Sequence, residues 1–149
     1  MSLSTDIMTA LKEAMKSKNT VALTALRAVK SAILLAQTES GAKQELTEEQ
    51  ELKILQKQVK QRKDSAAIFL EQGREDLAAP ELAEAEVISQ FLPEAMSDEE
   101  VAKVVDDVIA KTGAEGMKDM GKVMGMVSGQ LAGKADGKTI STIVKAKLS

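Results

Sequence analysis

Glycines recur at every fourth position near the end of this chain, at Gly121, Gly125, Gly129, Gly133 and Gly137. Seven of its nine glycines lie after residue 112, so the enrichment is local. Residues four apart share a face of an α-helix, so the first three of these glycines would leave a strip without side chains. Each glycine costs about 1 kcal/mol relative to alanine in a helix interior. The spacing therefore predicts a helix that another backbone approaches closely, or a helix that ends early.

Basic residues accompany the glycines. Lys118, Lys122, Lys134 and Lys138 punctuate the segment, and residues 116–149 hold six lysines against two acids, a net charge of +4. Residues 97–115 hold six acids against two lysines, a net charge of −4, and the whole chain carries −3. A second basic run extends from Lys53 to Lys63, which by default is a solvated helix face. The charge pattern indicates local basic faces on a chain that is not basic overall.

The fold class follows from residue types that favour helices. Ala, Leu, Lys, Glu and Met are abundant, whereas Phe69 and Phe91 are the only aromatic residues among 149. Strand-forming aromatics are scarce, so we expect an all-α fold. We expect an N-terminal four-helix module over residues 1–92, followed by a small C-terminal three-helix bundle over residues 96–149. The segment Leu92–Pro93–Glu94 resembles a linker between them.

Apolar periodicity and capping residues place the individual helices. The N-terminal helices are expected over residues 5–16, from Asn19 or Thr20 to 38, over 48–72, and from a first turn containing Pro80 to a point before Pro93. The C-terminal helices are expected after Ser97, over 118–131, and after Asp136. Residues Gly41–Leu46 are expected to form a loop, and Gly73 and Gly113 to end helices. Met15, Leu34 and Leu82 are assigned to buried faces.

Several classes of site are excluded by composition. The chain has no cysteine and no histidine, so disulfides, Cys–His pairs and histidine-based zinc sites cannot form. Neighbouring carboxylates such as Asp106 and Asp107 point to different faces of a helix. We therefore expect no catalytic residues, no metal and no cofactor. No apolar run approaches 18 residues and the first residues do not resemble a secretory signal, so we expect a cytoplasmic protein without a membrane partner.

Two features of the C-terminal segment each allow a structural and a functional interpretation. The turn around Asp136 is explained either by ordinary turn and capping chemistry or by a phosphate held at a glycine-rich helix start. The GxxxGxxxG spacing is explained most simply by close packing against another helix of the same bundle. Met120 and Met124 fit the core, whereas Met117 and Met126 fit an exposed, adaptable docking surface.

The chain resembles the YqeY-like family in several segments that span its length. These are KQRKDS at 60–65, GREDLA at 73–78, FLPEAMSDEE at 91–100, MKDMGKVMG at 117–125 and GKADGK at 133–138. Its C-terminal half also resembles the tail of the B subunit of the tRNA-dependent Asp/Glu amidotransferase (GatB). One departure is Ala95–Met96, where the pattern has a Gln–Leu pair. The resemblance implies an all-helical, two-part fold and a relative of a tRNA-binding tail.

Three functional hypotheses follow. The first is an accessory module that binds tRNA or another structured RNA and acts with amidotransferase subunits or another translation protein. The residues expected at that surface are Lys118, Gly121, Lys122, Gly125, Gly133, Lys134, Gly137, Lys138 and Lys145, with Lys147 adding to the field. The second is a protein-docking module without RNA. The third is an enzyme, because the resemblance carries the label of a carbon–nitrogen ligase with glutamine as amido-N-donor.

Overall fold

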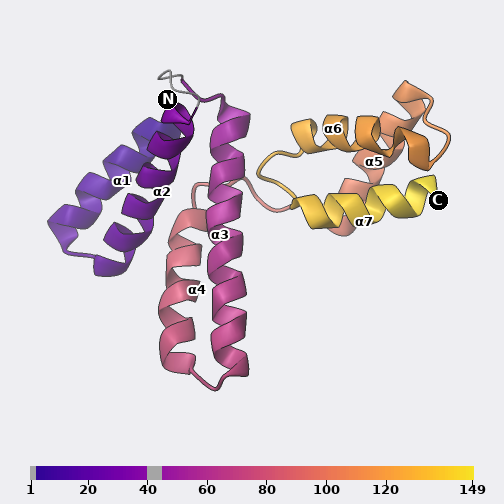
Figure 1. The fold of residues 1–149 in the computed structure, drawn as a ribbon. Coiled ribbons are helices and arrows are strands. Elements are labelled where there is room, and N and C mark those ends of the chain that lie inside the picture. The colour runs from indigo at the N-terminus through magenta and orange to yellow at the C-terminus, as the bar shows by residue number, and fades with distance from the viewer. Residues whose placement is uncertain (1–2, 40–44) are drawn as a thin grey trace. The chain divides into compact units, whose positions relative to one another are not determined.

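The computed structural model describes residues 3–39 and 45–149, and no strand occurs among them (Figure 1). The all-α class is therefore confirmed. The chain divides into two compact units, Met1–Leu92 and Pro93–Ser149. Of the predicted loop Gly41–Leu46, residues 41–44 lie outside the described residues. The elements are α1 (Leu3–Ser17), α2 (Thr20–Thr38), α3 (Glu48–Glu71), α4 (Glu75–Ser89), α5 (Asp98–Thr112), the 3₁₀ turn η1 (Met117–Asp119), α6 (Met120–Gln130) and α7 (Gly137–Leu148).

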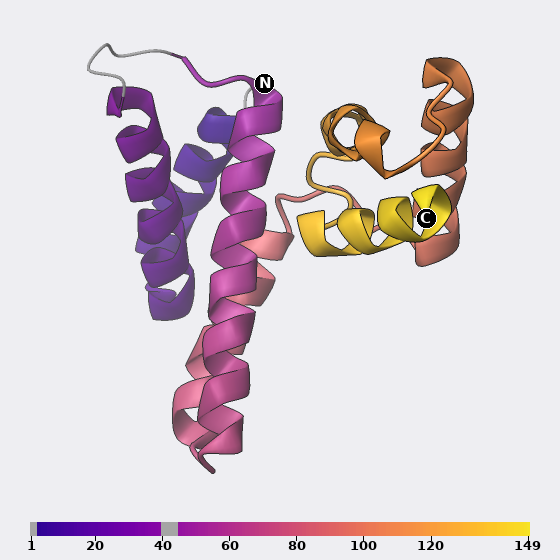
Figure 2. The same ribbon diagram turned by 45° about the vertical axis from the view of Figure 1, so that its right-hand side comes forward.

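The N-terminal unit is built on the long hairpin of α3 and α4, which run side by side in both views (Figures 1 and 2). Small residues line the contact: Ala66 of α3 and Ala78 and Ala85 of α4 are each 1% exposed. Small side chains let two helices approach closely, since little volume separates their backbones. Near the other end of the hairpin, α1 and α2 close an aliphatic core that includes Ile7, Leu11, Leu26, Val29, Ile33, Leu55 and Ile88.

The turn between α3 and α4 follows a pattern that ends many helices. Gly73 has φ = 70°, and the Gly73 and Arg74 amides donate to the carbonyls of Leu70 and Phe69 at 3.1 and 2.8 Å. This Schellman arrangement satisfies the last carbonyls of α3, as the glycine predicts. It also lets α4 begin at Glu75, so the prediction of a first turn around Pro80 is wrong. Pro80 lies inside α4, where the ring removes one backbone hydrogen bond.

The predicted inward faces of the N-terminal unit are too wide. Met15 is 56% exposed, Leu34 is 47% exposed and Leu82 is 44% exposed, although each was assigned to a buried stripe. Alanines occupy much of the contact instead, because Ala14, Ala22 and Ala25 are buried on α1 and α2. Alanine is small enough for a tight contact, and the larger neighbours are left at its edge. Hydrophobicity alone did not distinguish the two roles.

Helix α2 is long and apolar enough to cross a membrane, judged by length and composition alone. Core helices of water-exposed proteins pass the same test, and five α2 residues are buried in the core of this unit. Yet only 28% of the apolar window is buried. The sequence expectation rested on uninterrupted apolar runs, and Arg27 and Lys30 interrupt this one without removing its apolar character.

The C-terminal unit packs α5, α6 and α7 around a core in which valine predominates. Val101, Val105 and Val108 come from α5, Val123 and Val127 from α6, and Ile140, Val144 and Leu148 from α7. Ser97 and Glu100 form the predicted capping box at the start of α5, and Gly113, with φ = 66°, ends the helix. These local signals fix the helix ends, and the spacing of the valines fixes which face turns inward.

Asp76 provides a test of the turn between α3 and α4. The Arg74 guanidinium donates two hydrogen bonds of 3.0 Å to its carboxylate, and this contact holds the pKa of Asp76 below its ordinary value. A carboxyl with a lowered pKa stabilises the fold above its ordinary titration range, and the contribution is lost as the pH falls through the lowered pKa. We expect carboxyl NMR titration to show this lowered pKa, and Arg74→Ala to raise it toward the ordinary value, because the guanidinium is the largest cause of the shift. An unchanged Asp76 pKa in Arg74→Ala would contradict the assignment.

Candidate nucleic-acid interface

Helix α6 is sharply divided into a buried face and a bare exposed face. Val123 and Val127 are fully buried, and Met120 and Met124 pack partly buried against the same core. On the opposite half of the helix, a strip of glycines without side chains lies beside a row of three long side chains. The exposed residues of this half are Gly121, Lys122, Gly125, Met126, Gly129 and Gln130. At 100° per residue these six positions cover about half of the helix circumference.

Within the C-terminal unit, all of which the structure describes, nothing packs against the glycine strip of α6. A β-carbon added to Gly121, Gly125 or Gly129 would meet no other heavy atom within 4 Å. The interpretation of the strip as a close contact inside the bundle is therefore wrong. The valines and methionines of α6 pack into the core of the bundle, and the glycines therefore face outward. Gly129 belongs to this strip as well, and its four-residue spacing from Gly125 is the sequence signal for it.

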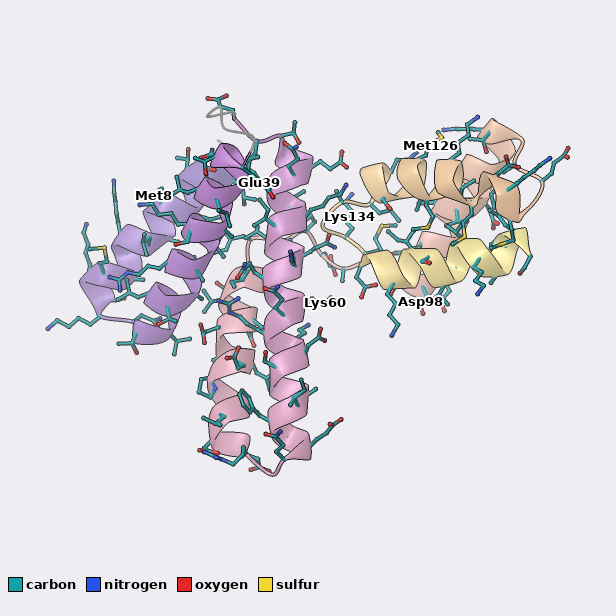
Figure 3. The ribbon with its side chains drawn as sticks, in the orientation of Figure 1. Met8, Glu39, Lys60, Asp98, Met126 and Lys134 are labelled. Atoms are coloured by element: carbon teal, nitrogen blue, oxygen red, sulfur yellow. The ribbon has the colours of Figure 1, made fainter. Side chains whose placement is uncertain are left out.

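The predicted lysines are exposed and are distributed over η1, α6, the α6–α7 connection and α7. Lys118 lies in η1 before α6, and Lys122 lies in the first turns of α6. Lys134 is in the α6–α7 connection, where Figure 3 labels it, and Lys138 is at the start of α7. Because α6 and α7 run in opposite directions, Lys145 in the last turn of α7 returns to the end where α6 begins (Figure 1). The 11 residues of α6 span about 16 Å, and this length separates Lys118, Lys122 and Lys145 at one end from Lys134 and Lys138 at the other.

Most of these lysines have no acidic partner in the described part of the chain. All five side chains are exposed, and among the described residues no ion pair involves Lys118, Lys122, Lys134, Lys138 or Lys145. Lys147 differs, because its Nζ lies 3.2 Å from Asp106 of α5. The expectation that Lys147 adds to the basic field is therefore weakened by a neutralising neighbour. An exposed pair of this kind contributes little to stability.

The α6–α7 connection is shaped by glycine and by an aspartate cap. Gly133 is buried with φ = 81°, so it serves the turn and is not part of the exposed surface. Asp136 caps α7 by accepting a hydrogen bond from the Thr139 amide at 2.6 Å. Its carboxylate occupies the helix start, where a phosphate would otherwise bind. This geometry supports the ordinary turn interpretation for Asp136 and leaves exposed Gly137 and Lys138 beside it.

Met96 ties this connection to the beginning of the unit. Its amide donates to the carbonyl of Lys134 at 2.9 Å, and its side chain packs half-buried against the valine core. Met96 stands where the family pattern has a leucine, and the core accepts it because methionine adapts to irregular gaps. The hydrogen bond holds the backbone of Lys134 in place, and this fixes the point from which its side chain extends.

The basic run of α3 behaves as a solvated helix face with one internal contact. Lys53 pairs with Glu49 at 2.8 Å and Lys60 with Asp64 at 4.0 Å, both between exposed side chains. Arg62 is the exception, because its Nε lies 3.7 Å from Glu84 of α4 and both side chains are mostly buried. Internal carboxylates thus neutralise part of this run. It is a weaker candidate surface than the α6–α7 face.

The described residues of the C-terminal unit offer surfaces for contact. In the part of the chain that the structure describes, no three His, Cys, Asp or Glu side chains lie close enough together to hold a metal ion. What the C-terminal unit offers is contact: backbone that can be approached closely, cations without internal partners, and the methionines Met117 and Met126, which are 44% and 38% exposed. Lysine supplies point charges for phosphate, and bare glycine removes the steric barrier to a second backbone.

Comparison with known proteins gives a family and one curated relative. The family described as Yqey-like protein matches residues 4–148. The chain is also similar to Altered inheritance of mitochondria protein 41, mitochondrial, of Clavispora lusitaniae, with 44% identity over 94 residues. That match covers 61% of this chain and 53% of the relative, so the chain spans about half the length of the curated relative it matches.

The open glycine strip predicts an unusual stability effect. Gly125→Ala should stabilise the C-terminal unit by about 1 kcal/mol, because the new methyl group meets open space and alanine favours the helix. Gly113→Ala, at the C-cap of α5, is the matched control and should destabilise the unit by about that amount, because its φ of 66° is strained for alanine. Urea unfolding of both variants measures the difference. Destabilisation by Gly125→Ala would show that the strip is packed in solution.

Proposed function

Since the chain belongs to the YqeY-like family, we propose that its C-terminal unit binds the phosphate backbone of tRNA or another structured RNA. The observation that carries the proposal is the exposed α6 face, where glycines with nothing packed on them lie beside Lys118 and Lys122. Lysines that lack internal acids keep their charge available for phosphates. The glycines let an RNA backbone reach the helix without meeting side chains.

The composition of the unit favours contact with RNA shape and backbone over contact with bases. Proteins that read single-stranded bases usually stack them on aromatic side chains, and the chain holds only Phe69 and Phe91. Both phenylalanines belong to the N-terminal unit. A-form RNA presents its phosphates and 2′-hydroxyls over an extended surface, which suits lysines spread along two antiparallel helices.

The biological role that we propose is an accessory one, acting with amidotransferase subunits or another translation protein. The likeness of the C-terminal unit to the amidotransferase tail supports this role, because that tail helps to hold tRNA while a separate core performs the reaction. Chemistry by this chain alone has no support in the arrangement of its side chains. We place the protein in the cytoplasm, as its composition suggests, although the fungal relative is named as mitochondrial.

A tRNA titration at two salt concentrations tests the RNA proposal. Contacts with about four phosphates predict a log–log salt slope of about −3 to −4. The double variant Lys122→Glu and Lys134→Glu should bind at least about tenfold more weakly and reduce the slope by about 2, because two phosphate contacts are lost. A fluorescence anisotropy assay with labelled bulk tRNA measures both quantities.

The control for this titration makes the same charge change on α5. Lys103 and Lys111 are exposed positions on the acidic helix α5, and replacing both with Glu alters the net charge by the same amount. We expect a much smaller effect from this control. Equal losses of tRNA affinity in the two double variants would show that binding depends only on net charge. The absence of binding at low salt would eliminate the RNA proposal.

A protein partner is the second candidate, favoured by the exposed Met117 and Met126 beside the glycine strip. Methionines adapt to varied apolar surfaces, and a glycine face receives a helix closely. Gly125→Leu should then abolish capture of a purified tRNA-dependent amidotransferase in a binding assay, while Lys122→Glu leaves it intact. Loss with Lys122→Glu but not with Gly125→Leu would reject docking through this strip.

A further inference from the structure

One face of the α1–α2 hairpin combines exposed apolar side chains with cations. From α1 come half-buried Met8 and exposed Lys12 and Met15, and from α2 come exposed Arg27, Lys30 and Leu34. Met15 and Leu34 are large apolar side chains with exposed fractions of 56% and 47%. Figure 3 labels Met8 on α1. We call these six residues the cationic–apolar face.

The two helices contribute to one continuous surface. Met8, Lys12 and Met15 are four and three residues apart and so share a side of α1, as Lys30 and Leu34 share a side of α2. A shallow apolar groove of about 150 Å³ joins the two sides, because Met8, Lys30 and Leu34 all line it together with Ser4, Ile7, Ile33 and Gln37. The groove shows that the side chains from α1 and α2 meet in space.

The acidic residues of α1 and α2 lie away from this face, and the buried Glu51 of α3 accepts a hydrogen bond of 2.9 Å from Ser4, which lines the groove. Asp6 is two positions from Met8 and Glu13 is two positions from Met15, so each lies about 160° around α1 from its neighbour. Helix α2 contains no acid among its 19 residues, and its C-cap Glu39 is five positions from Leu34, about 140° around the helix. Among the described residues, no ion pair involves Lys12, Arg27 or Lys30. The positive charge is therefore open to an external anion.

We propose that the cationic–apolar face rests on an anionic lipid surface. Phosphate groups of lipids would pair with Lys12, Arg27 and Lys30. Met15 and Leu34 would be buried at the boundary of the acyl chains, so a membrane interface suits both kinds of side chain. RNA supplies the phosphates without the apolar medium. The apolar character of α2, of which only 28% is buried in its most apolar window, points the same way.

In this arrangement α2 lies on the membrane surface and does not cross the membrane. Five α2 residues, among them Leu26, Val29 and Ile33, belong to the aliphatic core of the N-terminal unit, and a spanning helix would have to leave that core. The proposal departs from the sequence expectation that no membrane takes part. It uses a different unit from the proposed RNA surface, so the failure of one proposal leaves the other standing.

Vesicle sedimentation with the full chain tests the proposal. Vesicles of phosphatidylcholine that contain about 30% phosphatidylserine are compared with vesicles of pure phosphatidylcholine at low salt. This proportion is similar to that of cytoplasmic leaflets rich in anionic lipid. We expect binding to the anionic vesicles alone. The double variant Lys12→Glu and Lys30→Glu should reduce partitioning by about thirtyfold or more, because losing each cation near an anionic surface costs about a factor of five and each new carboxylate adds repulsion.

Two further variants separate this face from general charge. Lys57→Glu with Lys60→Glu makes the same charge change on the exposed side of α3 and should retain binding. Leu34→Ser should weaken binding without removing a charge, with circular dichroism confirming that the helices remain. The proposal fails if anionic vesicles bind no protein, if both charge reversals act equally, or if Leu34→Ser has no effect. Binding of an acidic amphipathic peptide in place of vesicles would reassign the face to a protein partner.

Discussion

Burial of a narrow aliphatic strip from each helix is the interaction on which both units depend. The C-terminal unit has nine buried apolar side chains in its core, five of them the valines of α5 and α6. A valine is short, so the three helices must lie close together to exclude water from it. Helix α6 contributes only Val123 and Val127 as fully buried residues within its bounds. Because so few residues satisfy the core, the other half of that helix is free of any packing requirement.

This freedom explains how three glycines persist in a helix of 11 residues. Their propensity cost of about 1 kcal/mol each falls on a small unit with a modest core. No packing contact in the unit benefits from the missing side chains. A feature that weakens the fold without improving its packing is the kind expected at a functional surface. The lysines around it, which have no ion pair among the described residues, are consistent with the proposed contact.

Local sequence signals predicted the helix ends better than the helix faces. Asn19, Thr47, Ser97 and Asp136 all cap the helices that they were expected to cap, because capping depends on a few neighbouring backbone amides. Exposure depends on distant residues, and so Met15, Leu34 and Leu82 were misassigned. The start of α4 was missed because the hydrogen bonds after Gly73 allow a helix several residues before Pro80. The outward orientation of the glycine strip also required the tertiary structure, since spacing identifies a face but not its neighbour.

The bare face of α6 also affects how its backbone is protected from water. Side chains on an exposed helix normally shield part of the amide and carbonyl groups beneath them, and at Gly121, Gly125 and Gly129 that cover is missing. Solvent can therefore compete for these peptide groups directly, and local opening of α6 costs less than opening of α5 or α7. A molecule that lies along the strip would replace the missing cover and slow amide hydrogen exchange in α6. The helix thus carries its own reporter of occupancy in the exchange rates of its backbone amides.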